Sequence, residues 1–174
     1  QLVRQRAYPS WLYPVINGAT TMWERWNSWN AETGFGDIGM NSFNHYAYGA
    51  IGHWMYQVVA GMRIRKPRYK HILIHPEPDD GLEYAHATFE SPFGTIASGW
   101  KKEQGKLIIN VAIPANTTAT IVLPEAKLNH VTESGKPAHE VFKDIRQHEK
   151  NVVVETGSGE YVFQYDFETP KNPR

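Results

Sequence analysis

From Pro67 to Phe167, apolar residues recur at every second position in short runs, and Gly, Pro, Asn and Asp residues separate the runs. Successive side chains of a β-strand point to opposite faces of a sheet, so a period of two is typical of strands with one buried face. The runs are His71–His75, Leu82–Glu90, Thr95–Glu103, Leu107–Ile113, Thr117–Leu123, Val152–Thr156 and Tyr161–Phe167. Short strands at this spacing predict an antiparallel β-sandwich of about a hundred residues.

The composition changes near the same place. Nine of the eleven prolines lie at or after Pro67. Up to Pro76 there are three acidic residues against eight Lys or Arg, whereas the remainder holds fifteen acids against ten. A shift of this kind indicates a boundary between structural units. We therefore expect one unit over residues 1–66, a β-sandwich over residues 67–168, and a tail over residues 169–174.

The overall composition excludes several classes of function. The formal net charge is zero, so no global field draws the chain to nucleic acid or to a membrane. There is no cysteine, which excludes disulfides and thiol chemistry and leaves a periplasmic or cytoplasmic location equally open. No apolar run is long enough for a membrane span, and no signal peptide is expected. Because the chain opens on Gln1-Leu2-Val3-Arg4 rather than Met, it is interpreted as part of a longer polypeptide.

One long helix is predicted over Ser42–Ala60, with Asn41 or Ser42 as its cap and Gly61 as its stop. Its apolar residues, including Trp54, repeat at the three-four spacing of a buried helical face. A shorter helical tail is expected over Gln1–Tyr8, ending before Pro9 because a residue that precedes proline disfavours helical geometry. Thr20 to Trp29 has no clear period and is expected to be irregular.

Aromatic residues are concentrated before residue 55, where five of the six tryptophans lie. Trp23, Trp26 and Trp29 follow one another at spacing three and bracket Glu24 and Arg25. Aromatic rings mixed with a few polar groups suit a concave site for a ligand that is partly apolar and partly hydroxylated, such as a sugar.

Each residue of this stretch has a structural and a functional interpretation. Glu24 is either an ordinary carboxylate paired with Arg25, or a partly desolvated base that deprotonates water. His45 either caps the helix or donates a hydrogen bond to a ligand hydroxyl. Trp23, Trp26 and Trp29 are either core residues or, for at least one of them, a stacking surface for a sugar. The residues alone leave these alternatives open.

Motifs for metals and nucleotides are weak. Gly34-Phe35-Gly36-Asp37-Ile38-Gly39 has the glycine spacing of a dinucleotide loop, but no strand precedes it and no acid follows at the required distance. His71 and His75 are better explained as strand residues, and His139-Glu140 lacks a second histidine for a zinc motif. The sequence therefore predicts no metal and no cofactor.

Three segments of the first unit resemble a known family. They are Pro9-Ser10-Trp11-Leu12-Tyr13-Pro14, Gly18-Ala19-Thr20-Thr21-Met22-Trp23-Glu24-Arg25-Trp26, and Gly39-Met40-Asn41-Ser42-Phe43-Asn44-His45-Tyr46-Ala47-Tyr48-Gly49. They resemble the end of the catalytic domain of bacterial α-L-rhamnosidases of glycoside hydrolase family 78. Ile74-His75-Pro76 and Pro114-Ala115-Asn116-Thr117-Thr118-Ala119 resemble the C-terminal β-sandwich of that family. The resemblance implies an α+β fragment, with the last helices of an (α/α)6 barrel followed by an antiparallel β-sandwich.

The resemblance also implies a chemistry. The family hydrolyses rhamnosides, releasing terminal α-L-rhamnose with inversion, through an acid that protonates the leaving oxygen and a base that activates water. By their positions, Glu24 matches the general base and His45 the sugar-contacting histidine, while Trp23, Arg25 and Trp26 are assigned to substrate binding. The general acid belongs to a motif in the upstream remainder of the barrel. The fragment alone is therefore expected to be inactive.

Two other roles are possible for the β-sandwich. A carbohydrate-binding module would need exposed aromatic residues on one sheet face, whereas Tyr84, Phe89, Trp100 and Tyr161 are scattered along the sequence. A structural cap on the barrel, or a dimer contact, needs no such face.

Overall fold

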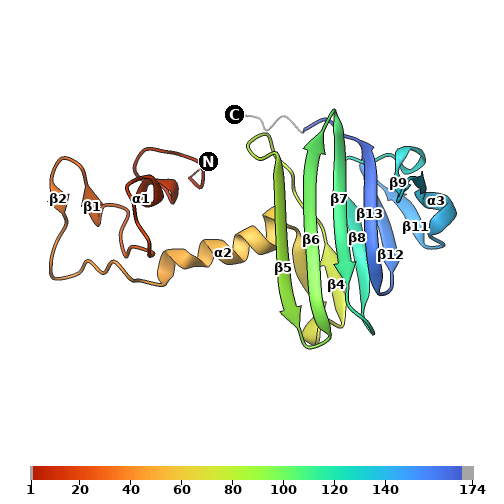
Figure 1. Cartoon of the computed structure of the whole chain (residues 1–174), viewed down its shortest axis with the longest axis horizontal. Helices are drawn as coiled ribbons and strands as arrows, with labels where there is room; N and C mark the ends of the chain where they lie inside the picture. Colours follow the sequence, from red (N-terminus) through yellow and green to blue (C-terminus); the bar gives the residue numbers. More distant parts are fainter. Residues whose placement is uncertain (1, 170–174) are drawn as a thin grey trace. The chain divides into compact units, whose positions relative to one another are not determined.

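The computed structural model describes residues 2–169. The described residues form two compact units, divided between His53 and Trp54 (Figure 1). Within residues 2–169, no helix combines the length and the apolar character needed to cross a bilayer.

The second unit contains the expected β-sandwich, built from two sheets (Figure 1). The five-stranded sheet has the order β11 (Ile145–His148), β12 (Asn151–Thr156), β8 (Thr118–Leu123), β4 (His71–Ile74) and β3 (Met62–Lys66). The six-stranded sheet has the order β10 (Lys136–Pro137), β9 (Thr132–Glu133), β13 (Gly159–Asp166), β7 (Lys106–Ile113), β6 (Gly94–Glu103) and β5 (Tyr84–Ser91). Short helical turns lie at η3 (Pro67–Tyr69), η4 (Leu128–His130) and α3 (Ala138–Val141).

Alternation along the strands makes the core. In β7 and β8 every second residue is buried, and β12 adds Val152 and Val154 to the same continuous cluster between the sheets. Its fully buried side chains include Ile72, Ile74, Ile96, Leu107, Ile109, Ile121, Leu123, Val152, Val154 and Phe163. Neighbouring strands pair antiparallel, except that β4 and β8 run parallel, with His71 opposite Thr118 and Ile74 opposite Ile121.

Every run that the sequence predicted as a strand is a strand, within a few residues at each end. Two further strands of four or five residues, β3 and β11, were missed. Both lie at the edges of the five-stranded sheet, and in both the charged and polar residues outnumber the apolar ones. β3 pairs with β4, so Met62–Lys66 contributes to the sheet although it falls within the range 1–66.

The first unit has little regular structure. It contains α1 (Leu12–Ile16), a small hairpin of β1 (Trp29–Asn30) and β2 (Gly34–Phe35), and the 3₁₀ turn η1 (Ala47–Ala50). The chain then continues through α2 (Ile51–Trp54) and the π-helical turn η2 (Met55–Val59). The helical tail expected over Gln1–Tyr8 is wrong for the described residues 2–8, which form turns and bends. Thr20 to Trp29 is irregular, as predicted.

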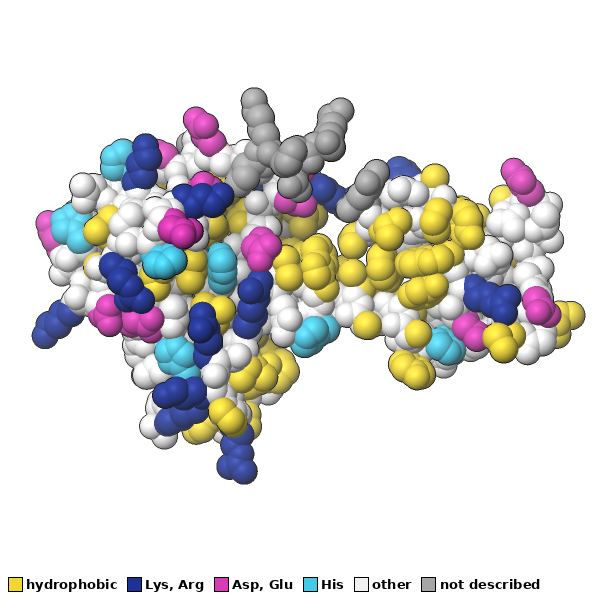
Figure 2. Space-filling model, turned by 180° about the vertical axis from the view of Figure 1, so that it is seen from behind, with side chains coloured by type: hydrophobic (Ala, Val, Ile, Leu, Met, Phe, Trp, Pro, Cys, Tyr) yellow, Lys and Arg dark blue, Asp and Glu magenta, His cyan; other side chains and the backbone are white. Residues whose placement is uncertain are grey.

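The helix predicted over Ser42–Ala60 is too long and its face is not buried. Helical structure begins at Ala47, because Ser42 and His45 use their backbone groups to bond the segment that ends at Glu24. Trp54, predicted as core, is 41% exposed, and Tyr46 is 88% exposed. The residues described here include no second long helix that could cover this face. Other apolar side chains of this unit are also exposed, among them Val15, Phe35, Ile38 and Met40, and Figure 2 shows apolar side chains on the surface of this unit.

Candidate active site

Two segments of the first unit lie side by side and bring together the motifs that carry Glu24 and His45. The backbone N–H of Glu24 donates to the carbonyl of Ser42 at 2.9 Å, and the backbone N–H of His45 donates to the carbonyl of Met22 at 2.8 Å. The hydroxyl of Thr21 donates to the carbonyl of Phe43. Residues 21–24 and 42–45 are thus joined through backbone groups, although about twenty positions separate them.

The Glu24 carboxylate is half-buried and has one fixed oxygen. Its Oε2 accepts a hydrogen bond from the backbone N–H of Ser42 at 2.7 Å. Within residues 2–169, Oε1 has no protein hydrogen-bond partner, and Glu24 makes no ion pair with Arg25. The backbone N–H of Arg25 instead donates to the hydroxyl of the buried Ser28 at 3.2 Å. The carboxylate therefore keeps one oxygen available for another group.

One ring nitrogen of His45 is occupied, which leaves the other free to donate a hydrogen bond. Its Nδ1 accepts a hydrogen bond from the backbone N–H of Ala47 at 3.3 Å. A neutral imidazole that accepts at Nδ1 carries its proton on Nε2, so Nε2–H is free to donate. The ring also stacks on Tyr46, with centroids 5.2 Å apart and planes 12° apart.

The tryptophans of the motif belong to two different aromatic groups. Trp26 stacks on Tyr48 with centroids 4.0 Å apart, and Trp11 meets Trp26 edge to face at 4.8 Å. The indole N–H of Trp11 donates to the carbonyl of Tyr48 at 2.9 Å, which closes this group. Trp26 therefore packs between two rings.

Trp23 belongs to the second aromatic group, which lines a hollow of about 300 Å³. The aromatic walls of the hollow are Trp23, Trp29, Phe35 and Phe43, and residues 17–21 complete it. Trp23 and Phe35 both meet the ring of Phe43 edge to face at 5.4 Å. Sequence reasoning missed Phe35 and Phe43 as wall residues, because it placed the first in a glycine loop and the second on a buried helical stripe. Of the residues that the sequence analysis considered for sugar contact, Trp23 and Trp29 line this hollow; Glu24, Arg25, Trp26 and His45 do not.

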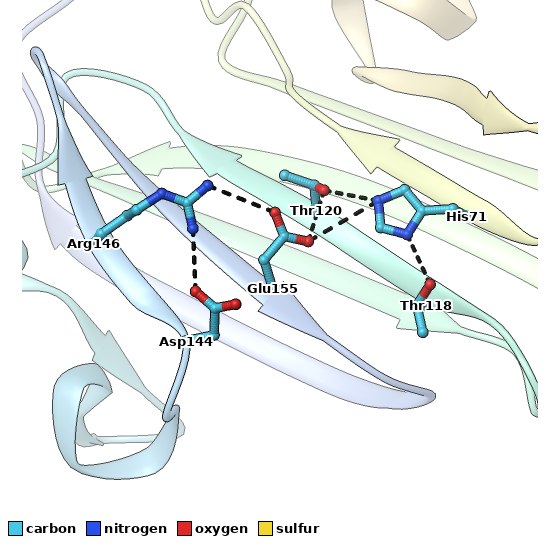
Figure 3. A network of polar contacts seen from close by, with 6 residues as sticks. All are labelled: His71, Thr118, Thr120, Asp144, Arg146 and Glu155. Atoms are coloured by element: carbon cyan, nitrogen blue, oxygen red, sulfur yellow. Dashed lines mark hydrogen bonds and ion pairs between the residues drawn. The ribbon is translucent and has the colours of Figure 1, made fainter.

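A second polar cluster lies on the β-sandwich (Figure 3). The ring nitrogens of His71 bond the hydroxyls of Thr118 and Thr120 at 2.7 and 2.8 Å, and Thr120 donates to Glu155 at 2.8 Å. Arg146 extends the cluster from Glu155 to Asp144. The described part of the chain holds no group of three or more His, Asp or Glu residues arranged to bind a metal ion.

The aromatic residues of the β-sandwich do not form one exposed face. Trp100 is only 2% exposed, and its indole N–H donates to the carbonyl of Val59 at 2.7 Å. Phe89 packs against Tyr69, and Tyr161 packs against Phe163. Tyr84 is 71% exposed. This arrangement lacks the aromatic platform that a sugar-binding sheet face would need.

Comparison with known families matches both parts of the chain. Residues 1–59 match the bacterial alpha-L-rhamnosidase 6 hairpin glycosidase domain, and residues 61–138 match the bacterial alpha-L-rhamnosidase C-terminal domain.

Curated relatives agree. An alpha-L-rhamnosidase of Streptomyces avermitilis is 39% identical over 94% of this chain and 15% of its own length. One of Formosa agariphila is 41% identical over 94% of this chain and 18% of its own. The chain thus spans less than a fifth of either relative.

Solved structures show the same likeness. The crystal structure of the Streptomyces avermitilis alpha-L-rhamnosidase complexed with L-rhamnose has a TM-score of 0.84 and 37% identity, and the match covers 95% of this chain and 16% of that one. The alpha-L-rhamnosidase from Dictyoglumus thermophilum has a TM-score of 0.80 and 32% identity, over 95% of this chain and 18% of that one.

Proposed function

The chain belongs to the bacterial α-L-rhamnosidase family, and from this membership we propose that it is part of a glycoside hydrolase that releases terminal α-L-rhamnose from rhamnosides. The first unit supplies the last part of an (α/α)6 catalytic barrel, whose remainder lies outside this chain. The second unit is the C-terminal β-sandwich. The chain covers only 15% and 18% of the two relatives, which supports this division of the enzyme.

Glu24 is the general base of the proposed reaction. One oxygen, Oε2, is held by the N–H of Ser42, and Oε1 is left to accept a proton from water. The resulting hydroxide attacks the anomeric carbon while a carboxylic acid from outside this chain protonates the leaving oxygen. Attack on the face opposite the leaving group inverts the configuration. The assignment rests on one observation: the half-buried carboxylate of Glu24, which lies in the family motif, is held by a hydrogen bond from the backbone N–H of Ser42.

His45 and the aromatic residues bind the sugar. The Nε2–H of His45 donates to a rhamnose hydroxyl, because its Nδ1 is already occupied by Ala47. Trp23, Trp26 and Arg25 complete the binding surface, and the indole rings offer an apolar wall to the methyl group of this 6-deoxy sugar. L-Rhamnose-containing glycans or glycosides are therefore the proposed substrates.

The β-sandwich is proposed to act as a structural cap on the catalytic domain rather than as a lectin-like module. Its buried Trp100 and its scattered aromatic residues support this role.

The function is tested by the anomer of the product. The enzyme that carries this chain together with the rest of its barrel is mixed with an aryl α-L-rhamnoside, and the first product is followed by proton NMR. We expect β-L-rhamnose to appear first and then to mutarotate. Initial release of the α-anomer would exclude inversion, and no release of rhamnose would exclude the activity.

A further inference from the structure

Strand β3 and the turn that joins it to β4 are unusually basic. Between Asp37 and Glu77 the sequence contains no acidic residue, while Arg63, Arg65, Lys66, Arg68 and Lys70 fall within eight positions. In the rest of the chain acids and bases are mixed. The lower end of the β-sandwich in Figure 2 carries Lys and Arg side chains and no acidic ones. Positive charge is therefore concentrated locally on a chain whose net charge is zero.

Two of these cations are used within the fold. Arg63 pairs with Glu77 at 2.7 Å. The Nζ of Lys70 bonds the side-chain oxygen of Asn116 at 3.1 Å and lies 5.0 Å from the centre of the Phe93 ring. The other three, Arg65, Lys66 and Arg68, are exposed. They have no hydrogen-bond or ion-pair partner for their side chains within residues 2–169, so their charges face solvent.

The turn that carries Arg68, directly after the β3 residues Arg65 and Lys66, is held in one conformation. Arg68 and Tyr69 both have positive φ angles, 57° and 61°, a conformation that residues other than glycine adopt only when their surroundings impose it. The ring of Tyr69 packs against Phe89 with centroids 4.6 Å apart, which anchors the turn to β5. An irregularity in the pairing of β3 lies at Arg65, between Ile64 and Lys66. A surface that is already ordered loses less entropy when it binds a ligand.

From this geometry we propose that Arg65, Lys66 and Arg68 form a binding site for an anionic polysaccharide that bears carboxylate groups. Carboxylates are spaced along a uronate-containing glycan, and guanidinium and ammonium groups pair with them directly. A polysaccharide suits the site better than single-stranded nucleic acid, because the turn shows no exposed aromatic ring on which bases would stack. The proposal rests on the proposed function, since it adds an acidic glycan to a rhamnoside hydrolase.

The test is affinity electrophoresis of the enzyme that carries this chain together with the rest of its barrel, in gels that contain polygalacturonate or neutral dextran. We expect polygalacturonate to retard the enzyme, dextran to leave it unaffected, and added salt to weaken the retardation. The variant Arg65→Gln/Lys66→Gln/Arg68→Gln should bind about tenfold more weakly. The matched control Lys127→Gln/Lys136→Gln/Lys143→Gln removes the same charge from other exposed sites and should bind as the wild type does.

Several outcomes would overturn the proposal. They are no retardation of the wild type, equal losses in the two triple variants, or tighter binding to duplex DNA or anionic vesicles than to polygalacturonate. If the variant Arg65→Gln/Lys66→Gln/Arg68→Gln were retarded as strongly as the wild type, these cations would only keep the edge strand β3 from pairing with another chain. The substitutions lie at exposed positions, and matching thermal melts confirm that both variants fold. The assay needs no catalysis, so its outcome is separate from that of the product-anomer experiment.

Discussion

Glu24 and Ser42 bond each other twice: the N–H of Glu24 donates to the Ser42 carbonyl at 2.9 Å, and the Ser42 N–H donates to the Glu24 carboxylate at 2.7 Å. The orientation of the carboxylate is thereby set by main-chain groups. Substitution of the Ser42 side chain leaves this arrangement in place, whereas replacing Glu24 with a residue that has no side-chain acceptor removes the second hydrogen bond.

The first prediction concerns the proposed base. In the enzyme that contains this chain, Glu24→Gln keeps an acceptor for the Ser42 N–H but cannot take a proton from water. We expect kcat to fall by about 10²–10⁴-fold with little change in the dissociation constant for rhamnose. Steady-state kinetics and calorimetry measure the two quantities. Glu32→Gln, at an exposed position in the β1–β2 hairpin, is the control and should stay near wild type. Near-normal turnover of Glu24→Gln would remove the assignment.

The second prediction concerns sugar binding by His45. His45→Ala removes the Nε2–H donor, and we expect kcat/KM for an aryl rhamnoside to fall about tenfold, mostly through KM. His53→Ala changes an exposed histidine of α2 and serves as the comparison. Equal effects of the two substitutions would contradict a direct role for His45.

The third prediction concerns the start of the β-sandwich. Gly61 has φ +76°, and a Cβ placed there would lie 2.1 Å from the backbone nitrogen of Pro76 and 2.3 Å from the carbonyl carbon of His75. Gly61→Ala is expected to lower the free energy of unfolding by about 3 kcal/mol or more.

Gly105 is a closely matched control for this substitution. It has the same φ of +76°, but a Cβ added at Gly105 would meet no atom within 4 Å, so Gly105→Ala should cost only about 1 kcal/mol. Urea unfolding at about 25 °C separates the two variants. Equal losses would show that backbone strain alone, without the close approach of residues 75 and 76, decides the effect.

The fourth prediction concerns pH. Burial and the neighbouring Arg63 lower the pKa of His75 below its ordinary value of 6.5, while Glu77 opposes the shift. The unfolded chain then binds more protons at this residue, so its contribution to stability is complete above pH 6.5 and is lost as the pH falls towards the folded pKa.

Replacing the ring with an amide tests this dependence. Relative to His75→Gln, the wild type should lose unfolding free energy between about pH 7 and pH 5, as measured by urea titration. Parallel pH profiles for the two proteins would exclude His75 as the source.

The alternation that builds the sandwich core could be read from the sequence because burial on one face imposes it. β3 and β11 could not, because an edge strand such as Met62–Lys66 buries only part of one face and carries charge instead. The parallel pairing of β4 with β8 could not be predicted from the sequence either, because no local signal indicates which distant strand lies beside His71–Ile74.

In the first unit, tertiary hydrogen bonds overrode local propensity. Helical spacing continues back to Phe43, but the backbone groups of Ser42 and His45 bond Glu24 and Met22, which prevents the helix from starting there. The segment from Trp23 to Trp26 could be identified from the sequence as rich in aromatic residues. It could not show that Trp26 stacks on Tyr48 while Trp23 faces Phe43, because these partners are chosen by the fold and not by spacing.

The parallel neighbours β4 and β8 have a consequence for how the chain reaches its folded state. The whole β5–β6–β7 meander separates them, so the five-stranded sheet closes only after a loop of more than forty residues has been ordered. During synthesis, β4 emerges with an open edge well before its partner exists. A polypeptide stopped before Thr118 would carry that unmatched edge permanently, which makes early termination in this region a direct route to aggregation.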